Sequence, residues 1–118
     1  MILLKIYWRT KAAIKKLCFK IMFGKRFSVG KNTTFRKNFG LYLEKGASIK
    51  IGHDCFFNRG CSVNCLESVE IGNHTIFGEN VKIYDQNHKF RDRTKLIREQ
   101  GYSTGRVKIG NNCWICTN

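Results

Sequence analysis

The sequence predicts an all-β solenoid, a coil of short strands stacked turn upon turn, preceded by one amphipathic helix. Four stretches repeat one nine-residue phrase: FSVGKNTTF from Phe27, IKIGHDCFF from Ile49, VEIGNHTIF from Val69 and VKIGNNCWI from Val107. Within this repeat an apolar residue recurs at every sixth position. A six-residue period fits neither a helix of 3.6 residues per turn nor a long alternating strand, so it indicates short strands joined by tight corners.

The six-residue register covers most of the chain after residue 26. Its apolar positions fall in sets of up to three, one set for each turn of the coil: Val29, Phe35 and Leu41; Ile51, Phe57 and Val63; Ile71, Phe77 and Ile83; Ile109 and Ile115. A second class of position carries small or β-branched residues: Thr33, Cys55, Cys61, Thr75, Val81 and Cys113. We therefore expect one large side chain from each face of a turn to point inward.

Residues 1–26 form a predicted basic amphipathic helix, separate from the coil of residues 27–118. Eleven of the 22 Lys and Arg residues precede residue 41, and no acid precedes Glu44. One side of the helix is apolar and the other largely basic: Leu3, Ile6, Tyr7, Ile14, Leu17, Cys18 and Ile21 against Lys5, Arg9, Lys11, Lys15, Lys16 and Lys20. Two interpretations stay open, a helix on an anionic membrane surface and a cap on the first turn of the coil. Nucleic acid is not expected, because no recognised binding module accompanies the charge.

The six cysteines are predicted to be free thiols. Cys55, Cys61 and Cys113 are explained as small residues of the repeat, and no second CxxC complements Cys113 and Cys116. The early apolar stretches MILL and CFKIMFG are short and interrupted by lysine, unlike a signal peptide. The expected location is therefore the reducing cytoplasm.

The third turn of the coil carries a long insertion. The glycines that open the four phrases are separated by 22, 20 and then 38 residues: Gly30, Gly52, Gly72 and Gly110. Continuing the six-residue register from Ile83 gives Lys89, Lys95 and Gly101, none of which is aliphatic. Residues 89–106 are therefore predicted to be a loop that leaves the coil at a corner, with His88 at its start. Long loops in compact domains usually serve a function.

The repeat resembles that of the hexapeptide-repeat acyltransferases, whose fold is a left-handed parallel β-helix of triangular cross-section. The resemblance covers residues 27–118. Within this superfamily, EIGNHTIFGENVKIYDQNHKF and VKIGNNCWICTN are similar to segments of the maltose, galactoside and surface-polysaccharide O-acetyltransferases. The resemblance implies a homotrimer that moves acetyl from acetyl-CoA to a sugar hydroxyl. The basic helix favours a surface-polysaccharide precursor as acceptor.

The resemblance also implies roles for His88, Asn58, Trp114 and Thr117, and Asp85 is a further candidate because it lies three residues before His88. His88 matches the general base, a role that suits histidine because imidazole titrates near neutral pH. Asp85 either holds that imidazole, contacts the acceptor, or is simply solvated. Asn58 matches an asparagine that contacts the acceptor in the galactoside enzymes, or is a corner asparagine in a left-handed conformation. Trp114 and Thr117 lie in NNCWICTN, which in the family lines the coenzyme A groove.

The sequence departs from the family pattern at two points. Cys116 stands where the family has glycine, and the sequence stops at Asn118, where the family's coil continues. The expectation is a coil without its C-terminal turns that binds coenzyme A weakly or not at all. The alternative is a non-catalytic remnant or trimer-forming scaffold.

No metal is expected from the histidine spacing. Zinc-dependent carbonic anhydrases of this fold place two ligand histidines five residues apart, whereas His53, His74 and His88 are separated by 21 and 14 residues. His53 and His74 are expected to be solvated at corners of the coil.

Overall fold

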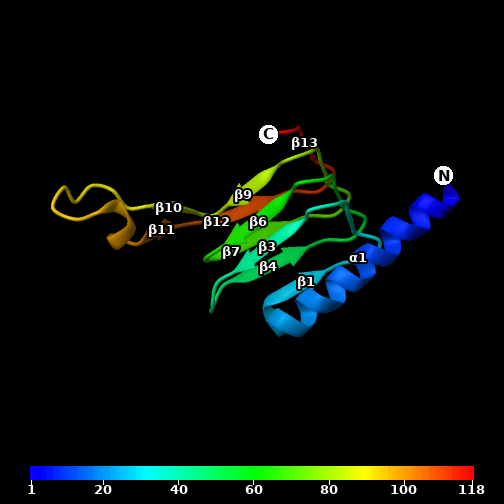
Figure 1. Cartoon of the computed structure of the whole chain (residues 1–118), viewed down its shortest axis with the longest axis horizontal. Helices are drawn as coiled ribbons and strands as arrows, with labels where there is room; N and C mark the ends of the chain where they lie inside the picture. Colours follow the sequence, from blue (N-terminus) through cyan, green and yellow to red (C-terminus); the bar gives the residue numbers. More distant parts are fainter.

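A computed structural model describes residues 1–118 and shows one long helix followed by short strands (Figure 1). Helix α1 spans Ile2–Phe23, and the 3-10 turn η1, Gly24–Arg26, leads into the first strand. No helix combines the length and apolar character that crossing a bilayer requires.

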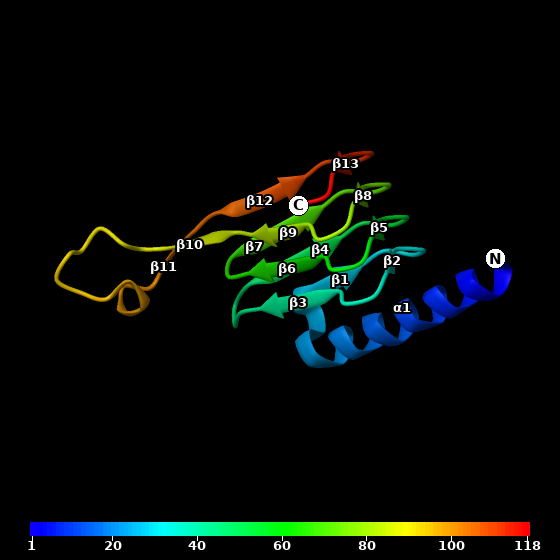
Figure 2. The same ribbon diagram turned by 45° about the horizontal axis from the view of Figure 1, so that its top comes forward.

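Eleven strands form three parallel sheets, and successive turns of the chain add one strand to each in rotation (Figure 2). The first sheet contains β1 (Phe27–Val29), β4 (Ser48–Ile51), β7 (Ser68–Ile71) and β12 (Arg106–Ile109). The second contains β2 (Thr34–Phe35), β5 (Phe56–Phe57), β8 (Ile76–Phe77) and β13 (Trp114–Ile115). The third contains β3 (Gly40–Leu43), β6 (Ser62–Cys65) and β9 (Lys82–Tyr84). This arrangement of parallel sheets is compatible with the β-helix that the repeat predicts.

The predicted six-residue register is confirmed by the strand pairing. Its eleven apolar positions pair in three columns, one in each sheet: Val29, Ile51, Ile71 and Ile109; Phe35, Phe57, Phe77 and Ile115; Leu41, Val63 and Ile83. The columns face a common core in which the rings of Phe57 and Phe77 stack 4.3 Å apart. Each turn thus buries its apolar side chains directly above those of the preceding turn.

The Thr and Cys residues of the repeat bond one turn to the next. Thr33 Oγ1 donates to the carbonyl of Gly52 (2.7 Å) and accepts from the amide of Cys55 (3.1 Å). Cys55 Sγ lies 3.0 Å from the carbonyl of Gly72, and Thr75 Oγ1 donates to that of Gly110 (2.8 Å). A small side chain with a hydrogen-bond donor satisfies these corner carbonyls, because buried backbone groups need partners.

The Gly and Asn residues of the nine-residue motif are explained by the corners that follow the first and the second sheet. A Cβ on Gly52 would lie 2.8 Å from the carbonyl carbon of Gly72, so the stacked backbones leave no room for a side chain. The positions with positive φ carry the residues that tolerate a left-handed backbone: Asn32, Asp54, His74 and Asn112 at one corner, and Asn38, Gly60, Asn80 and Asn118 at the next.

Helix α1 caps the first turn of the coil (Figure 2). The ring of Phe19 lies 5.5 Å from that of Phe27 and 6.2 Å from that of Phe39, and Ala12 is 2% exposed. Lys15 Nζ donates to the carbonyl of Phe39 (2.8 Å). The packed face is not the apolar side expected from the sequence, whose residues remain partly or fully exposed.

The insertion is a β-hairpin that projects from the coil (Figure 1). Strand β10 (Gln86–His88) pairs antiparallel with β11 (Tyr102–Thr104), and the 3-10 turn η2 (Ile97–Glu99) lies between them. The excursion therefore begins earlier than the expected residue 89 and ends before Arg106, which already belongs to β12. Pairing of the two stems satisfies backbone groups that a simple loop would leave to solvent.

Candidate functional site

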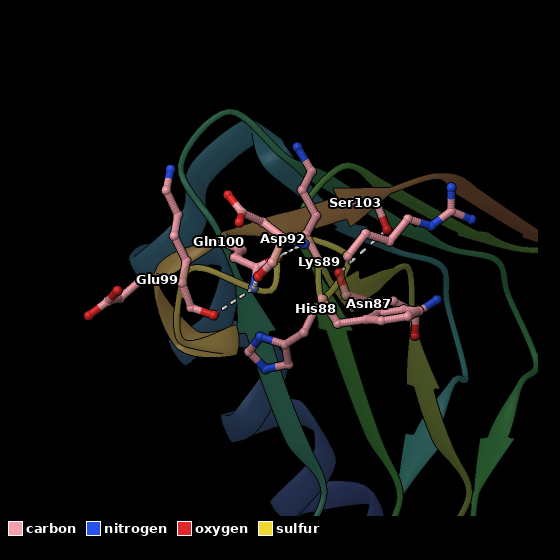
Figure 3. Close-up of a pocket in the computed structure, with 10 residues that line it drawn as sticks. Asn87, His88, Lys89, Asp92, Glu99, Gln100 and Ser103 are labelled. Atoms are coloured by element: carbon pink, nitrogen blue, oxygen red, sulfur yellow. Dashed lines mark hydrogen bonds between the residues drawn. The ribbon is translucent and has the colours of Figure 1, made fainter.

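His88 ends strand β10 and lines an open cavity within the hairpin (Figure 3). The cavity has a volume of about 770 Å³ and is lined by Asn87, His88, Lys89, Phe90, Arg91, Asp92, Lys95, Glu99, Gln100 and Ser103. His88 is exposed, and its ring lies 4.6 Å from that of Tyr102 on the paired strand. The pairing with β11 therefore places an aromatic wall beside an accessible imidazole.

The far wall of this cavity is ordered by side-chain hydrogen bonds (Figure 3). Gln100 Nε2 donates to the carbonyls of Asp92 (2.9 Å) and Lys95 (3.1 Å), while the Asp92 amide donates to Gln100 Oε1 (3.1 Å). The side chain and amide of Thr94 donate to Asp92 Oδ1 and lower the pKa of Asp92. Sequence reasoning treated this segment as a loop and missed these residues, since no local pattern marks a bond that spans eight positions.

Asp85 lies under a corner of the coil rather than beside the imidazole. It is 5% exposed, and its carboxylate accepts hydrogen bonds from the amides of Leu66 (2.8 Å), Glu67 (2.7 Å) and Ser68 (2.9 Å). Burial by itself would raise the pKa of Asp85, but the N–H donors and the Cys65 thiol hold that pKa below its usual range. The expectation that Asp85 is simply solvated is therefore wrong, and contact of Asp85 with an acceptor stays a prediction.

The thiol of Cys65 is held protonated by the same arrangement. Burial and the hydrogen bond to Asp85 raise the pKa of Cys65 to about 12. Sγ lies 3.4 Å from Asp85 Oδ2, so the thiol donates to the carboxylate. A thiol is nucleophilic only as the thiolate, so Cys65 is chemically inert at neutral pH.

We expect Asp85→Asn to lower the free energy of unfolding by about 1–3 kcal/mol at pH 7, because one amide oxygen cannot replace two charged acceptors. The folded-state pKa of Asp85 is lowered, so its contribution is present above the unfolded-state pKa of about 3.9 and is lost as the pH falls through the folded-state value. The stability difference between the two proteins should therefore be full at pH 7 and shrink below about pH 4. Urea titrations at several pH values measure it, with Glu99→Gln, which neutralises an exposed carboxylate, as control; a difference independent of pH would contradict the role.

Asn58, Trp114 and Thr117 lie together along another corner of the coil. Asn58 follows β5 and Thr117 follows β13, at the corner between the second and third sheets. Asn58 Oδ1 accepts from the amide of Arg59 (2.8 Å), and the left-handed position of its turn is occupied by Gly60. The left-handed explanation of Asn58 is therefore wrong, and its acceptor contact stays a prediction.

Trp114 is exposed, and Thr117 lies beside Gly78, which has no side chain. The Trp114 side chain is 72% exposed, and the Thr117 amide nitrogen lies 2.8 Å from where a Cβ of Gly78 would stand. The Thr117 hydroxyl donates to the carbonyl of Glu79. The hairpin that carries His88 leaves the coil after the third sheet, at a different corner. A single chain therefore does not bring His88 together with Trp114 and Thr117.

Two histidines far apart in sequence meet at a third corner. The rings of His53 and His74 lie 5.0 Å apart, and His53 Nδ1 lies 2.7 Å from Asp54 Oδ2. The hydrogen bond from His53 lowers the pKa of Asp54. Their ligand atoms all lie within 4.8 Å of one another, and imidazole with carboxylate is a set that binds divalent transition metals. The residues are exposed as expected, but sequence spacing did not predict their contact, which arises because stacked turns bring equivalent corners together.

Most of this chain is similar in sequence to a known protein. No protein-family model matches the chain. Over 92 residues, 78% of this chain, the sequence is 27% identical to a probable acetyltransferase of Mycobacterium tuberculosis. The chain spans 28% of the length of that relative.

Two solved structures of mutants of AntD, an N-acyltransferase from Bacillus cereus, overlap the chain with TM-scores of 0.29 and 0.30 at 17% identity. Each match covers 84% of this chain and 68% of the AntD chain, and both AntD structures contain coenzyme A. Over most of its own length this chain is similar in sequence to the probable acetyltransferase.

Proposed function

We propose that the chain transfers acetyl from acetyl-CoA to a sugar hydroxyl, with a surface-polysaccharide precursor as the acceptor. The observation that carries this proposal is the accessible imidazole of His88, held on the one hairpin that interrupts a repeat resembling that of the hexapeptide-repeat acyltransferases. The similarity to an acetyltransferase supports it. We further propose the left-handed coil of that family, a cytoplasmic location and peripheral contact with a membrane through residues 1–26.

The chemistry assigned to His88 is general base catalysis. Its imidazole accepts the proton of the acceptor hydroxyl while that oxygen attacks the thioester carbonyl. The imidazolium then returns the proton to the departing sulfur, so no acyl-enzyme is formed. Lys89, Arg91 and Lys95 outnumber Asp92 and Glu99 around the cavity, which favours substrates that carry phosphate.

Trp114 and Thr117 fit the binding of the acyl donor. Trp114 presents an exposed aromatic surface, and the missing side chain of Gly78 opens the approach to the Thr117 amide. That amide donates no hydrogen bond within the chain, so it is available to a carbonyl oxygen. The separation of these residues from His88 supports a homotrimer in which neighbouring subunits complete each site.

The alternative is a trimer-forming scaffold without catalytic activity. One observation favours it: no side chain in this chain hydrogen-bonds the His88 imidazole, because the carboxylate of Asp85 is turned to the backbone amides of residues 66–68. An imidazole without an orienting partner is a weaker general base than one whose tautomer is held.

A coenzyme A titration by calorimetry separates the two functions. For the transferase we expect saturable binding of coenzyme A. Trp114→Ala should weaken it several-fold, whereas Tyr42→Ala, which removes another exposed aromatic side chain, should not. No binding, or equal effects of the two substitutions, would favour the scaffold.

A further inference from the structure

Helix α1 has two apolar faces, and the first turn of the coil covers only one. The inner face packs on the coil through Ala12, Phe19 and Phe23. The outer stripe lies on the other side, with helical spacings of three or four residues and one gap of eight between Ile6 and Ile14, and its members are at least half exposed: Leu3, Ile6, Ile14, Leu17 and Ile21. A stripe of this length on solvent is unusual for a soluble helix that already has a packed face.

Basic side chains border the outer stripe on both sides. At 100° per residue, Lys5, Arg9, Lys16 and Lys20 fall along one flank, and Lys11 and Lys15 fall along the other. No acid precedes Glu44, and the two ion pairs of the structure, at His53 and Arg59, lie elsewhere. The charge of α1 is therefore uncompensated within the chain and complements an anionic surface.

A groove of about 600 Å³ runs between α1 and the corner after β2. It is lined by Trp8, Lys11, Ile14, Lys15, Cys18, Phe19, Phe35, Arg36, Lys37 and Asn38, so it holds four bases and no acid. The guanidinium of Arg36 lies 5.1 Å from the Trp8 ring centre, which fixes its position beside the helix. Burial, and then the neighbouring Lys11, lower the pKa of Lys15.

We propose that this groove binds the phosphate of an anionic phospholipid while the outer stripe lies in the membrane interface. The groove adjoins the stripe at Ile14, so a helix lying on a bilayer would hold it at the level of the headgroups. Lysine and arginine beside an interfacial helix extend to that level. The proposal rests on the membrane contact proposed above and is independent of acetyl transfer.

Two other occupants fit the surface less well. A second copy of α1 would cover the stripe but bring together two sets of bases with no acid between them. Nucleic acid would neutralise the bases but leave the apolar stripe in water. A bilayer that contains anionic lipid satisfies both features at once.

The test is co-sedimentation of the full chain with phosphatidylcholine vesicles, with and without phosphatidylglycerol. Arg36→Gln with Lys37→Gln removes two groove bases, and Lys45→Gln with Lys50→Gln removes the same charge from the exposed coil. At about fivefold for each base at the surface, the groove double variant should bind phosphatidylglycerol vesicles about 25-fold more weakly, and the control double variant much less so. Leu17→Glu should abolish sedimentation, because it places a charge in the stripe.

Each of the following results would contradict part of the proposal. Equal loss in the two double variants would mean general charge attraction without a phosphate site in the groove. Unchanged sedimentation of Leu17→Glu would exclude the stripe from the membrane, and a smaller assembly by light scattering for this variant would assign the stripe to a second copy. Duplex DNA bound in preference to vesicles would assign the bases to nucleic acid. His88→Ala should sediment as the unmodified chain does, so failure of acetyl transfer would leave this test unaffected.

Discussion

His88→Ala should lower the turnover number for acetyl transfer by about a hundredfold or more, the usual scale of a lost general base. The affinity for coenzyme A should stay nearly unchanged, because Trp114 and Thr117 lie at another corner of the coil. Release of coenzyme A thiol in the presence of a sugar acceptor measures the rate. His53→Ala, which removes an exposed imidazole from a distant corner, is the matched control. Full acetyl transfer by His88→Ala would exclude His88 as the general base.

A mixture of two impaired variants, assayed at a low coenzyme A concentration where weaker binding limits Trp114→Ala, tests whether neighbouring chains share the site. If the proposed trimer combines His88 of one chain with Trp114 of the next, random assembly of His88→Ala and Trp114→Ala chains leaves about a quarter of the sites intact. We expect recovery of activity to about that fraction when the two chains are unfolded and refolded together. If each chain carries a complete site, no recovery follows, because every chain lacks one residue.

Phe57→Ala should lower the free energy of unfolding by about 3–5 kcal/mol, through lost burial and an unfilled cavity. Phe57 is 1% exposed, stacks on Phe77 at 4.3 Å with an interplanar angle of 5°, and lies 5.0 Å from Phe39. The change therefore opens the core between two consecutive turns. Urea denaturation followed by circular dichroism measures it.

Phe90→Ala is the control for the Phe57 experiment. This phenylalanine is 66% exposed on the hairpin, so its removal should change the stability by no more than about 0.5 kcal/mol. A loss below about 1 kcal/mol for Phe57→Ala would mean that the aromatic column is not the main support of the coil.

The placement of the candidate site was only partly readable from the sequence. The position of His88 at the start of an excursion followed from the failure of the register at Lys89, Lys95 and Gly101. The sequence also contains a pattern that indicates the burial of Asp85. Side chains alternate along a strand, and Asp85 lies two positions beyond inward-facing Ile83, as Cys65 lies two positions beyond Val63. An acid at such a position needs buried donors, and here the amides of the adjacent turn provide them.

The sequence by itself determined the register of the coil, the corners and the place of the insertion. Each of these depends on requirements that every turn repeats, an inward apolar side chain, a small corner residue and a left-handed position, so the pattern appears several times in 118 residues. Only the tertiary structure decided which face of α1 packs on the coil and how β10 and β11 pair. These features join segments through contacts that occur once, and the apolar spacing of α1 is equally compatible with either face inward until the first turn of the coil selects Phe19 and Ala12.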